Sequence, residues 1–355
     1  MTKSLYVVST SPHSGKSAVC LALALVLREE GVAVSYLKPL GASLMSHDGG
    51  HVDEDAYVAW NALGIDAPWE YASPVLLTDD LRAAPLAGPV VGLEARITEA
   101  LAHLSEGRDI VVMEGLGRTF DGQALGLSAP KVAELTDAAV MPVIGYRPDL
   151  DLDSMLLTQY LFRDRLLGIV INGAPPRLVE TTTTQLRPFM ERHGLNLFGV
   201  LARDPVLRSV TVNELAKELG GQVLCAEDHL DELVETYILG AMTGDAAFRF
   251  FQRKANKAVI TGGDRSDVIM AALRTSTCCL VLTGNLRPDV RVLGAAAERG
   301  VPMILVKEDT LTTTERVERA IGHVRLSSPK QIARLKETKS EYRGMAQAVK
   351  EALDL

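Results

Sequence analysis

A short loop of small residues near the N-terminus contains the first side chains that could do chemistry. It follows an apolar run that begins at Ser4, and it precedes a second apolar run, Ala18 to Leu27. The loop consists of Thr10, Ser11, Pro12, His13, Ser14, Gly15, Lys16 and Ser17. In a strand–loop–helix of this kind, backbone N–H groups surround phosphates, the lysine neutralises them and the serine hydroxyl reaches a magnesium ion. The usual pattern has a glycine where Thr10 stands.

Three more polar side chains stand where other apolar, strand-like runs end. Lys38 follows Val32 to Leu37, Glu114 follows residues 109–113, and Asn172 ends residues 166–172. Carboxyl ends of parallel strands meet at one edge of a sheet, where ligands bind. We therefore expect one site at this edge. The alternatives are that the glutamate is a cap or surface charge, and that Lys38 is a surface lysine.

These side chains need an α/β scaffold to position them. Short apolar runs alternate with helix-like stretches throughout the first half of the chain, which predicts a mostly parallel sheet covered on both faces. The polar, glycine-rich residues 43–55 are expected to form a loop that leads into a helix at 57–63. Further helices are predicted at 93–104, 151–161 and 178–193, and further strands at 109–113, 138–144, 166–172 and 196–201.

A second, smaller α/β domain is predicted to begin after Asp204. Thr211 and Glu214 have the spacing of a capping box, which predicts a helix from 211 to 219. Strands are expected at 222–225, 237–241, 258–260, 278–282 and 302–306. The predicted domains are residues 1–204 and 205–326. Residues 327–355 form a charged helical tail, either packed on its own domain or extended as an arm.

A second candidate site lies after the apolar run that ends at Ile260. It consists of Gly262, Gly263, Asp264 and Arg265. Glycines allow the backbone to approach an anion or nucleotide closely, and arginine offers a two-pronged hydrogen-bond donor. The alternative is a tight turn in which Asp264 caps a helix from 268 to 274.

The composition limits the classes of function. The 355 residues carry a formal net charge of −8 and lack a Lys/Arg block, which argues against general nucleic-acid binding. The four cysteines lack metal-ligand spacing, so reduced thiols and the cytoplasm are expected. The apolar runs are too short to cross a membrane, and the N-terminus has no signal-peptide core.

Together these motifs resemble known families. The first ~200 residues resemble dethiobiotin synthetase and its cobyrinate amidase relatives, a group of P-loop NTPases. The matching tracts are 9–17, 37–41, 55–56, 112–115 and 168–172. Residues 260–267 and 283–285 resemble the DRTGG domain. Both domains, in this order, stand at the front of long bacterial phosphate acetyltransferases.

The resemblance implies roles for individual residues. Lys16 would contact the β- and γ-phosphates of ATP, with Lys38 close to the γ-phosphate. Ser17, Asp55 and Glu114 would bind Mg²⁺, and Asn172 would contact the base. The relatives also imply a homodimer or higher oligomer. Ser9 stands where dethiobiotin synthetase usually has glycine, but serine is small and is compatible with nucleotide binding. After Gly41 the sequence departs from the biotin enzyme's substrate stretch, which argues against the biotin enzyme's own reaction.

Three functions remain open on this basis. The first is an ATP–Mg-binding regulator or sensor that acts on acetyl-phosphate metabolism through a small metabolite or a partner enzyme. The second is an ATP-dependent carboxylase or ligase acting on an unknown small carboxylate or amine. The third is a slow switch ATPase. Acetyltransferase activity is not expected.

Overall fold

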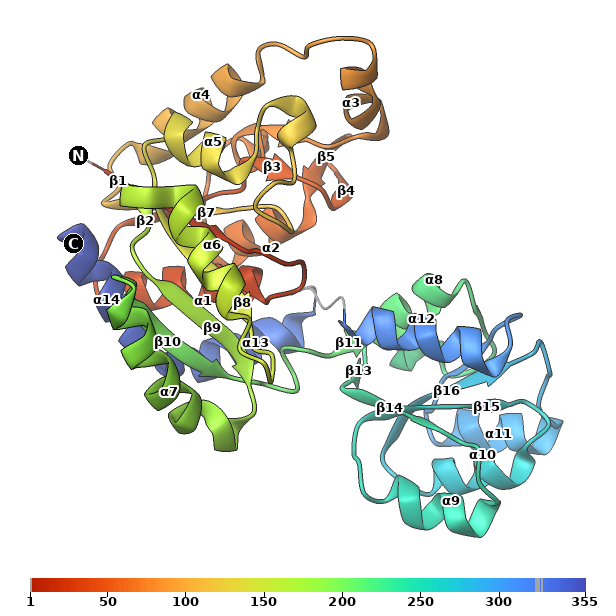
Figure 1. The fold of residues 1–355 in the computed structure, drawn as a ribbon. Coiled ribbons are helices and arrows are strands. Elements are labelled where there is room, and N and C mark those ends of the chain that lie inside the picture. The colour runs from red at the N-terminus through yellow and green to blue at the C-terminus, as the bar shows by residue number, and fades with distance from the viewer. Residues whose placement is uncertain (1, 323–325, 327) are drawn as a thin grey trace. The chain divides into compact units, whose positions relative to one another are not determined.

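The chain forms two compact units, described separately below (Figure 1). The computed structural model describes residues 2–322, 326 and 328–355. The first unit comprises residues 1–204 and 329–355, and the second comprises residues 205–328. The sequence predicts that the second domain ends at residue 326. The next residue, 327, lies outside the described residues.

The first unit is built on a parallel sheet of six strands in the order β10-β9-β8-β1-β7-β2. β1 lies between β7 and β8, where the strand order changes direction, so the loop after β1 opens at the switch point of the sheet. The predicted mostly parallel α/β fold is confirmed. The strands of this unit are β1 (Lys3–Val8), β2 (Val34–Leu37), β3 (Leu40–Gly41), β4 (Leu44–His47), β5 (Gly50–Asp53), β6 (Val75–Leu76), β7 (Ile110–Glu114), β8 (Ala139–Gly145), β9 (Ile169–Ala174) and β10 (Leu197–Ala202).

The helices of the first unit cover this sheet. They form because apolar side chains recur on the faces turned to the strands, as at Ile97, Ala100 and Leu104 of α4, which are buried. They are α1 (Lys16–Glu29), α2 (Glu54–Leu63), α3 (Asp79–Ala83), α4 (Leu93–Ser105), α5 (Ala129–Leu135), α6 (Leu152–Phe162), α7 (Val179–Arg192), α13 (Pro329–Thr338) and α14 (Arg343–Leu353).

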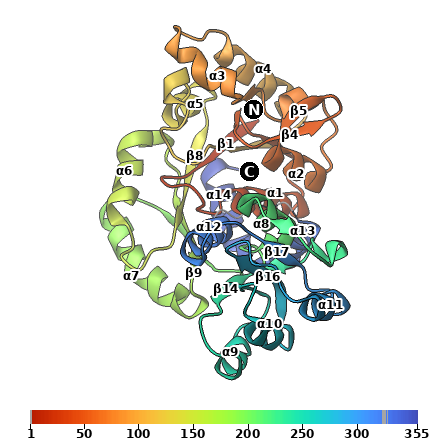
Figure 2. The ribbon, with the colours of Figure 1, turned by 90° about the vertical axis from the view of Figure 1, so that its right-hand side faces the viewer.

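The prediction of a loop at residues 43–55 is wrong. These residues form an antiparallel hairpin, β4–β5, which lies beside α2 (Figure 2). Asp48 and Gly49 turn the chain with positive φ angles of 44° and 79°. Polar side chains dominate the hairpin, so its alternation of apolar and polar residues is weak. Its last residue, Asp53, is nevertheless completely buried, which brings it into the site described below.

The second unit contains a sheet of five strands in the order β12-β17-β16-β15-β14. β14 to β17 are parallel, and β12 joins the edge antiparallel to β17. Its strands are β11 (Val210–Thr211), β12 (Gln222–Val223), β13 (Leu233–Val234), β14 (Thr236–Leu239), β15 (Lys257–Gly262), β16 (Thr277–Thr283) and β17 (Met303–Leu305). Its helices are α8 (Val212–Leu219), α9 (Gly244–Phe251), α10 (Ser266–Leu273), α11 (Val290–Glu298) and α12 (Thr310–Gly322).

Two apolar layers hold the second unit together. One lies between the sheet and α9, α10 and α11, and the other between the sheet and α8 and α12 (Figure 1). The predicted capping box is present: the Thr211 hydroxyl accepts from the Glu214 N–H, and the Glu214 carboxylate accepts from the Thr211 N–H. The α/β character predicted for this region is therefore confirmed.

The C-terminal helices belong to the first unit. α13, the 3₁₀ turn η7 (Lys339–Tyr342) and α14 pack against α1 (Figure 1). Leu335 and Val349 are completely buried there. At the surface, Lys339 pairs with Glu29 at 3.1 Å and Lys350 with Glu30 at 2.9 Å. The tail thus completes the layer over α1. Among the described residues, no helix is both long enough and apolar enough to cross a membrane.

Leu335→Ala should destabilise the first unit by about 2–4 kcal/mol, because it leaves a cavity between α13 and its neighbours. Both tryptophans of the chain, Trp60 and Trp69, are in this unit. Urea unfolding followed by tryptophan fluorescence therefore reports on it, with the exposed Lys336→Ala as the matched control. An unchanged fluorescence transition in Leu335→Ala would mean that the tail does not support the first unit.

Candidate functional site

The loop after β1 ends in a glycine that no other residue can replace without distortion. Gly15 precedes α1 in the left-handed conformation, with φ of 82°. A Cβ atom there would collide with the side-chain nitrogen of Asn172. That nitrogen donates a hydrogen bond of 2.8 Å to the carbonyl of Ser14. Asn172 therefore holds the loop in place through this hydrogen bond. Its contact with a base stays a prediction.

The loop carries polar atoms that the protein itself does not satisfy. The hydroxyls of Thr10 and Ser14 are buried and have no hydrogen-bond partner among the described residues. Buried hydroxyls normally find a partner, so such groups need an explanation. Ser9, in contrast, is satisfied, since its hydroxyl donates to the Ser11 carbonyl at 2.7 Å. This hydrogen bond joins two residues of the loop and helps to fix its conformation.

Glu114, at the end of β7, is the centre of a buried polar cluster. Its side chain is 1% exposed. The Ser17 hydroxyl donates to one carboxylate oxygen and the Tyr36 hydroxyl to the other, each at 2.6 Å. Ser17 lies in the first turn of α1 and Tyr36 in β2, so the cluster joins three elements around the switch point of the sheet.

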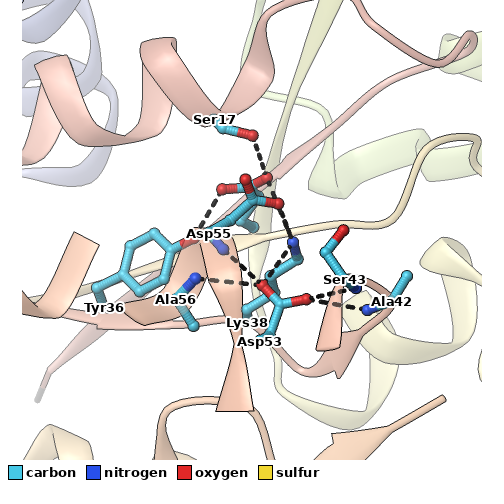
Figure 3. Close-up of polar contacts among 9 residues, drawn as sticks. Ser17, Tyr36, Lys38, Ala42, Ser43, Asp53, Asp55 and Ala56 are labelled. Carbon is cyan, nitrogen blue, oxygen red and sulfur yellow. Dashed lines mark hydrogen bonds and ion pairs between the residues drawn. The ribbon is translucent and has the colours of Figure 1, made fainter. Parts of the chain in front are cut away.

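Lys38 brings a positive charge to the same cluster. Its ammonium pairs with the carboxylates of Asp55 and Asp53, the latter at 2.9 Å, and lies 4.0 Å from Glu114 (Figure 3). The residue is 4% exposed. The interpretation of Lys38 as a surface lysine is therefore wrong.

Asp53 is fixed by the backbone around it. One of its carboxylate oxygens accepts from the N–H groups of Ala42 and Ser43, at 2.9 and 3.1 Å. The other accepts from Asp55 and Ala56, at 3.0 and 3.2 Å, and so caps α2. Four backbone donors and the Lys38 ammonium thus hold one carboxylate that has no contact with solvent.

The electrostatics of the cluster follow from burial and proximity. Burial raises the pKa of the Glu114 carboxyl, and the charge of Asp55 raises it further, whereas Lys38 and Lys16 lower it. For Lys38, burial lowers the pKa, but the neighbouring charges of Asp55, Glu114 and Asp53 outweigh it and raise the pKa overall. Burial also raises the pKa of Tyr36, followed by the charge of Glu114. The lysine is thus a permanent cation, and Tyr36 is a permanent hydrogen-bond donor.

The structure brings together most of the residues predicted for the site. Ser17, Asp55 and Glu114 supply a hydroxyl and two carboxylates, which are the hard oxygen ligands that Mg²⁺ prefers. Ser17 and Glu114 are directly bonded, whereas Asp55 is joined to them through Lys38. In the described part of the chain, no three His, Cys, Asp or Glu side chains are arranged to hold a metal by themselves.

Sequence reasoning missed two members of the cluster, Tyr36 and Asp53. Tyr36 is an aromatic residue within an apolar run, which is typical of core packing. Asp53 stands in the segment predicted to be a loop, although Asp-Glu-Asp before a helix is a recognisable capping signal. That signal could have identified Asp53 as a cap, but not as a partner of Lys38.

The second candidate site makes mainly structural contacts. Arg265 donates to the carbonyl of Met242 at 2.6 Å and pairs with Asp267 at 3.3 Å. Gly263 lies so close to the backbone of Leu286 that a side chain would not fit. The prediction that Asp264 caps the following helix is wrong, because α10 begins after Arg265 without a side-chain cap. The prediction of an anion or nucleotide site at residues 262–265 stays a prediction.

Comparisons with known proteins agree with this architecture. A family model described as an AAA domain matches residues 3–211, which is more than half of the chain. The chain belongs to the AAA domain family. A model of the DRTGG domain matches residues 214–320, so the AAA domain is followed by a DRTGG domain, as the sequence predicted.

Individual relatives extend this assignment. The chain is 28% identical over 362 residues to a phosphate acetyltransferase from Nitratidesulfovibrio vulgaris, covering 94% of this chain and 49% of that protein. It is 23% identical over 336 residues to a phosphate acetyltransferase from Synechocystis sp., covering 90% and 47%. It is also 28% identical over 182 residues to the ATP-dependent dethiobiotin synthetase BioD 2 from Escherichia coli, covering 50% and 77%. The chain spans about half the length of the phosphate acetyltransferases it matches.

Tyr36→Phe should lower the free energy of unfolding by about 1–3 kcal/mol, because it leaves a buried oxygen of Glu114 without its donor. Tyr160→Phe is the matched control, since Tyr160 is 74% exposed and should change stability by less than about 0.5 kcal/mol. Urea unfolding of both variants measures the difference. Equal stabilities for the two variants would contradict the hydrogen bond between Tyr36 and Glu114.

Proposed function

We propose that the AAA domain binds ATP together with Mg²⁺ at the loop after β1. The observation that carries this proposal is the position of Lys16 and Ser17 in the first turn of α1, with Glu114 directly across from Ser17. The N-terminus of a helix attracts phosphate through its N–H groups and its dipole. The two unpartnered hydroxyls of the loop, at Thr10 and Ser14, are further donors for an anion.

Each residue then has a defined role. Backbone N–H groups of residues 10, 11 and 13–15 surround the phosphates, and Lys16 neutralises the β- and γ-phosphates. Ser17, Asp55 and Glu114 hold the metal ion, which neutralises phosphate charge and orients the oxygens. Asn172 fixes the loop through Ser14, so it acts on the phosphates through the backbone. Lys38 is a second cation, and its ammonium lies 4.0 Å from Glu114, one of the proposed metal ligands.

For the whole chain we propose a regulatory or sensor role connected with acetyl-phosphate metabolism. The similarity to phosphate acetyltransferases over about 90% of the chain supports it. In this role ATP–Mg would occupy the AAA domain, while a small metabolite or a partner enzyme engages the DRTGG domain.

An ATP-dependent carboxylase or ligase is the second candidate. The similarity of half the chain to an ATP-dependent dethiobiotin synthetase favours it. Lys38 favours it as well, since a buried cation close to the phosphate loop could stabilise charge that develops during phosphoryl transfer. Incubation with ATP–Mg and a panel of small carboxylic acids and amines, followed by measurement of released phosphate, separates the two. Stimulated release by one compound would favour the ligase.

Lys16→Ala should weaken ATP–Mg binding at least about tenfold, because it removes a charge-assisted contact with phosphate worth about 1.5–3 kcal/mol. Isothermal titration calorimetry measures this change, and Lys131→Ala, on α5, is the control that should bind as the wild type does. A wild-type chain that shows neither heat of binding nor thermal stabilisation with ATP–Mg would refute the proposal.

A further inference from the structure

The charges around Lys38 do not balance. Three carboxylates, those of Asp53, Asp55 and Glu114, lie within 4.0 Å of a single ammonium. The cluster thus holds three carboxylates for the one ammonium in contact with them, and the charge of Lys16 also acts on Glu114. All four side chains are at most 13% exposed, so solvent screens this excess poorly.

We propose that Lys38 is an internal counter-ion that occupies the place of Mg²⁺ between Asp55 and Glu114, and that the metal displaces it while Asp53 retains it. The proposal rests on the Mg²⁺ site proposed above. It adds an exchange of cations at Asp55. Lys38 neutralises Asp55 before the metal binds, and the metal neutralises Asp55 afterwards. Lys38 then becomes available to an anion only when the metal is present.

The two aspartates are suited to different parts of this exchange. Asp53 already accepts four backbone N–H groups, and it is completely buried, so it cannot turn towards a metal without losing the cap of α2. Asp55 is the second residue of α2 and the most exposed carboxylate of the cluster, with a side chain that is 13% exposed. Asp53 is therefore the fixed anchor of the lysine, and Asp55 is the ligand that changes partner.

The other ligands can receive a metal without rearrangement. The Ser17 hydroxyl uses its hydrogen to bond Glu114, which leaves its oxygen lone pairs for a cation. Tyr36 and Ser17 each hold one oxygen of Glu114, which fixes the direction of that carboxylate. The ammonium of Lys38 lies between Glu114 and Asp55, in contact with Asp55 and 4.0 Å from Glu114.

The exchange avoids an unpaired buried charge at every stage. Removing one member of a buried ion pair is costly, because the remaining charge loses its partner. Here the lysine keeps Asp53 when it leaves Asp55, and Asp55 gains the metal. Lys38, still held at Asp53, is then directed towards the phosphates that the loop binds. The metal thus recruits a second cation to the nucleotide.

The decisive experiment uses no nucleotide. The full chain is freed of metal with EDTA, and Mg²⁺ alone is titrated into wild type and Lys38→Met by calorimetry. We expect Lys38→Met to bind Mg²⁺ at least about tenfold more tightly, because the metal no longer competes with the ammonium. Equal affinities in the two proteins would overturn the proposal. Because ATP is absent, this result does not depend on whether the chain binds nucleotide.

Two controls locate the effect. Lys257→Met removes another completely buried lysine, whose ammonium donates to the Thr275 hydroxyl and the Ser276 carbonyl. It should bind Mg²⁺ as the wild type does. The double variant Lys38→Met/Asp55→Asn should lose the gain in affinity. A gain that persists without the Asp55 charge would place the metal elsewhere and overturn the exchange.

Lys38→Met leaves three carboxylates without their counter-ion, and a folding defect in this variant would also change its affinity for Mg²⁺. A second measurement therefore uses the wild-type protein. Lysines labelled with ¹³C at Cε are observed by NMR, and the Lys38 signal is assigned by its absence in Lys38→Arg. We expect this signal to shift with ATP and Mg²⁺ but not with ATP and EDTA. If calorimetry shows that ATP–Mg binds and the signal stays unchanged, the exchange is refuted. If ATP does not bind, the nucleotide site fails and the Mg²⁺ titration alone decides the exchange.

Discussion

One buried ion-pair cluster determines the geometry of the first unit's functional edge. Lys38 stands directly after β2, Glu114 ends β7, and Asp53 and Asp55 flank the start of α2, so the cluster ties two strands of the central sheet to a helix and a hairpin. The Ser17 hydroxyl adds α1. Burying charges is unfavourable unless they are paired and hydrogen-bonded. Here Lys38 pairs with Asp53 and Asp55, and the Ser17 and Tyr36 hydroxyls bond Glu114. The contacts of these charges link the end of the hairpin, the start of α2 and the ends of β2 and β7.

The same cluster explains how far the sequence could predict the site. The strand–loop–helix pattern predicted Lys16 and Ser17. Lys38, Glu114 and Asn172 were predicted because each follows or ends an apolar run, and parallel strands bring such positions together. The role of Asp53 in the site could not be predicted, because it depends on the hairpin β4–β5. That hairpin is mostly polar and has little alternation of apolar and polar residues. Its conformation is set by the buried carboxylate and the Asp48–Gly49 turn rather than by its own periodicity.

The fold was predicted more completely than the contacts. Continuous apolar runs such as residues 109–113 and 278–282 are typical of strands buried on both faces, and both form strands. The sequence could not predict that Arg265 would be bonded to the Met242 carbonyl, or that Gly263 would lie against Leu286. Those contacts join residues that are more than 20 positions apart, and no local pattern specifies them.

The return of α13 and α14 to the first unit affects how the chain must fold. The ion pair between Lys350 and Glu30 joins residues 320 positions apart. During synthesis, the outer side of α1 therefore stays without its final cover until nearly the whole chain has emerged, although the sheet strands it packs on are complete much earlier. Contacts of such long range slow folding and leave apolar surface exposed to other chains in the meantime. A chain cut after residue 204 would contain every strand of the central sheet and the whole loop after β1. It would lack α13 and α14, which cover α1. Such a fragment should aggregate more readily than the full chain.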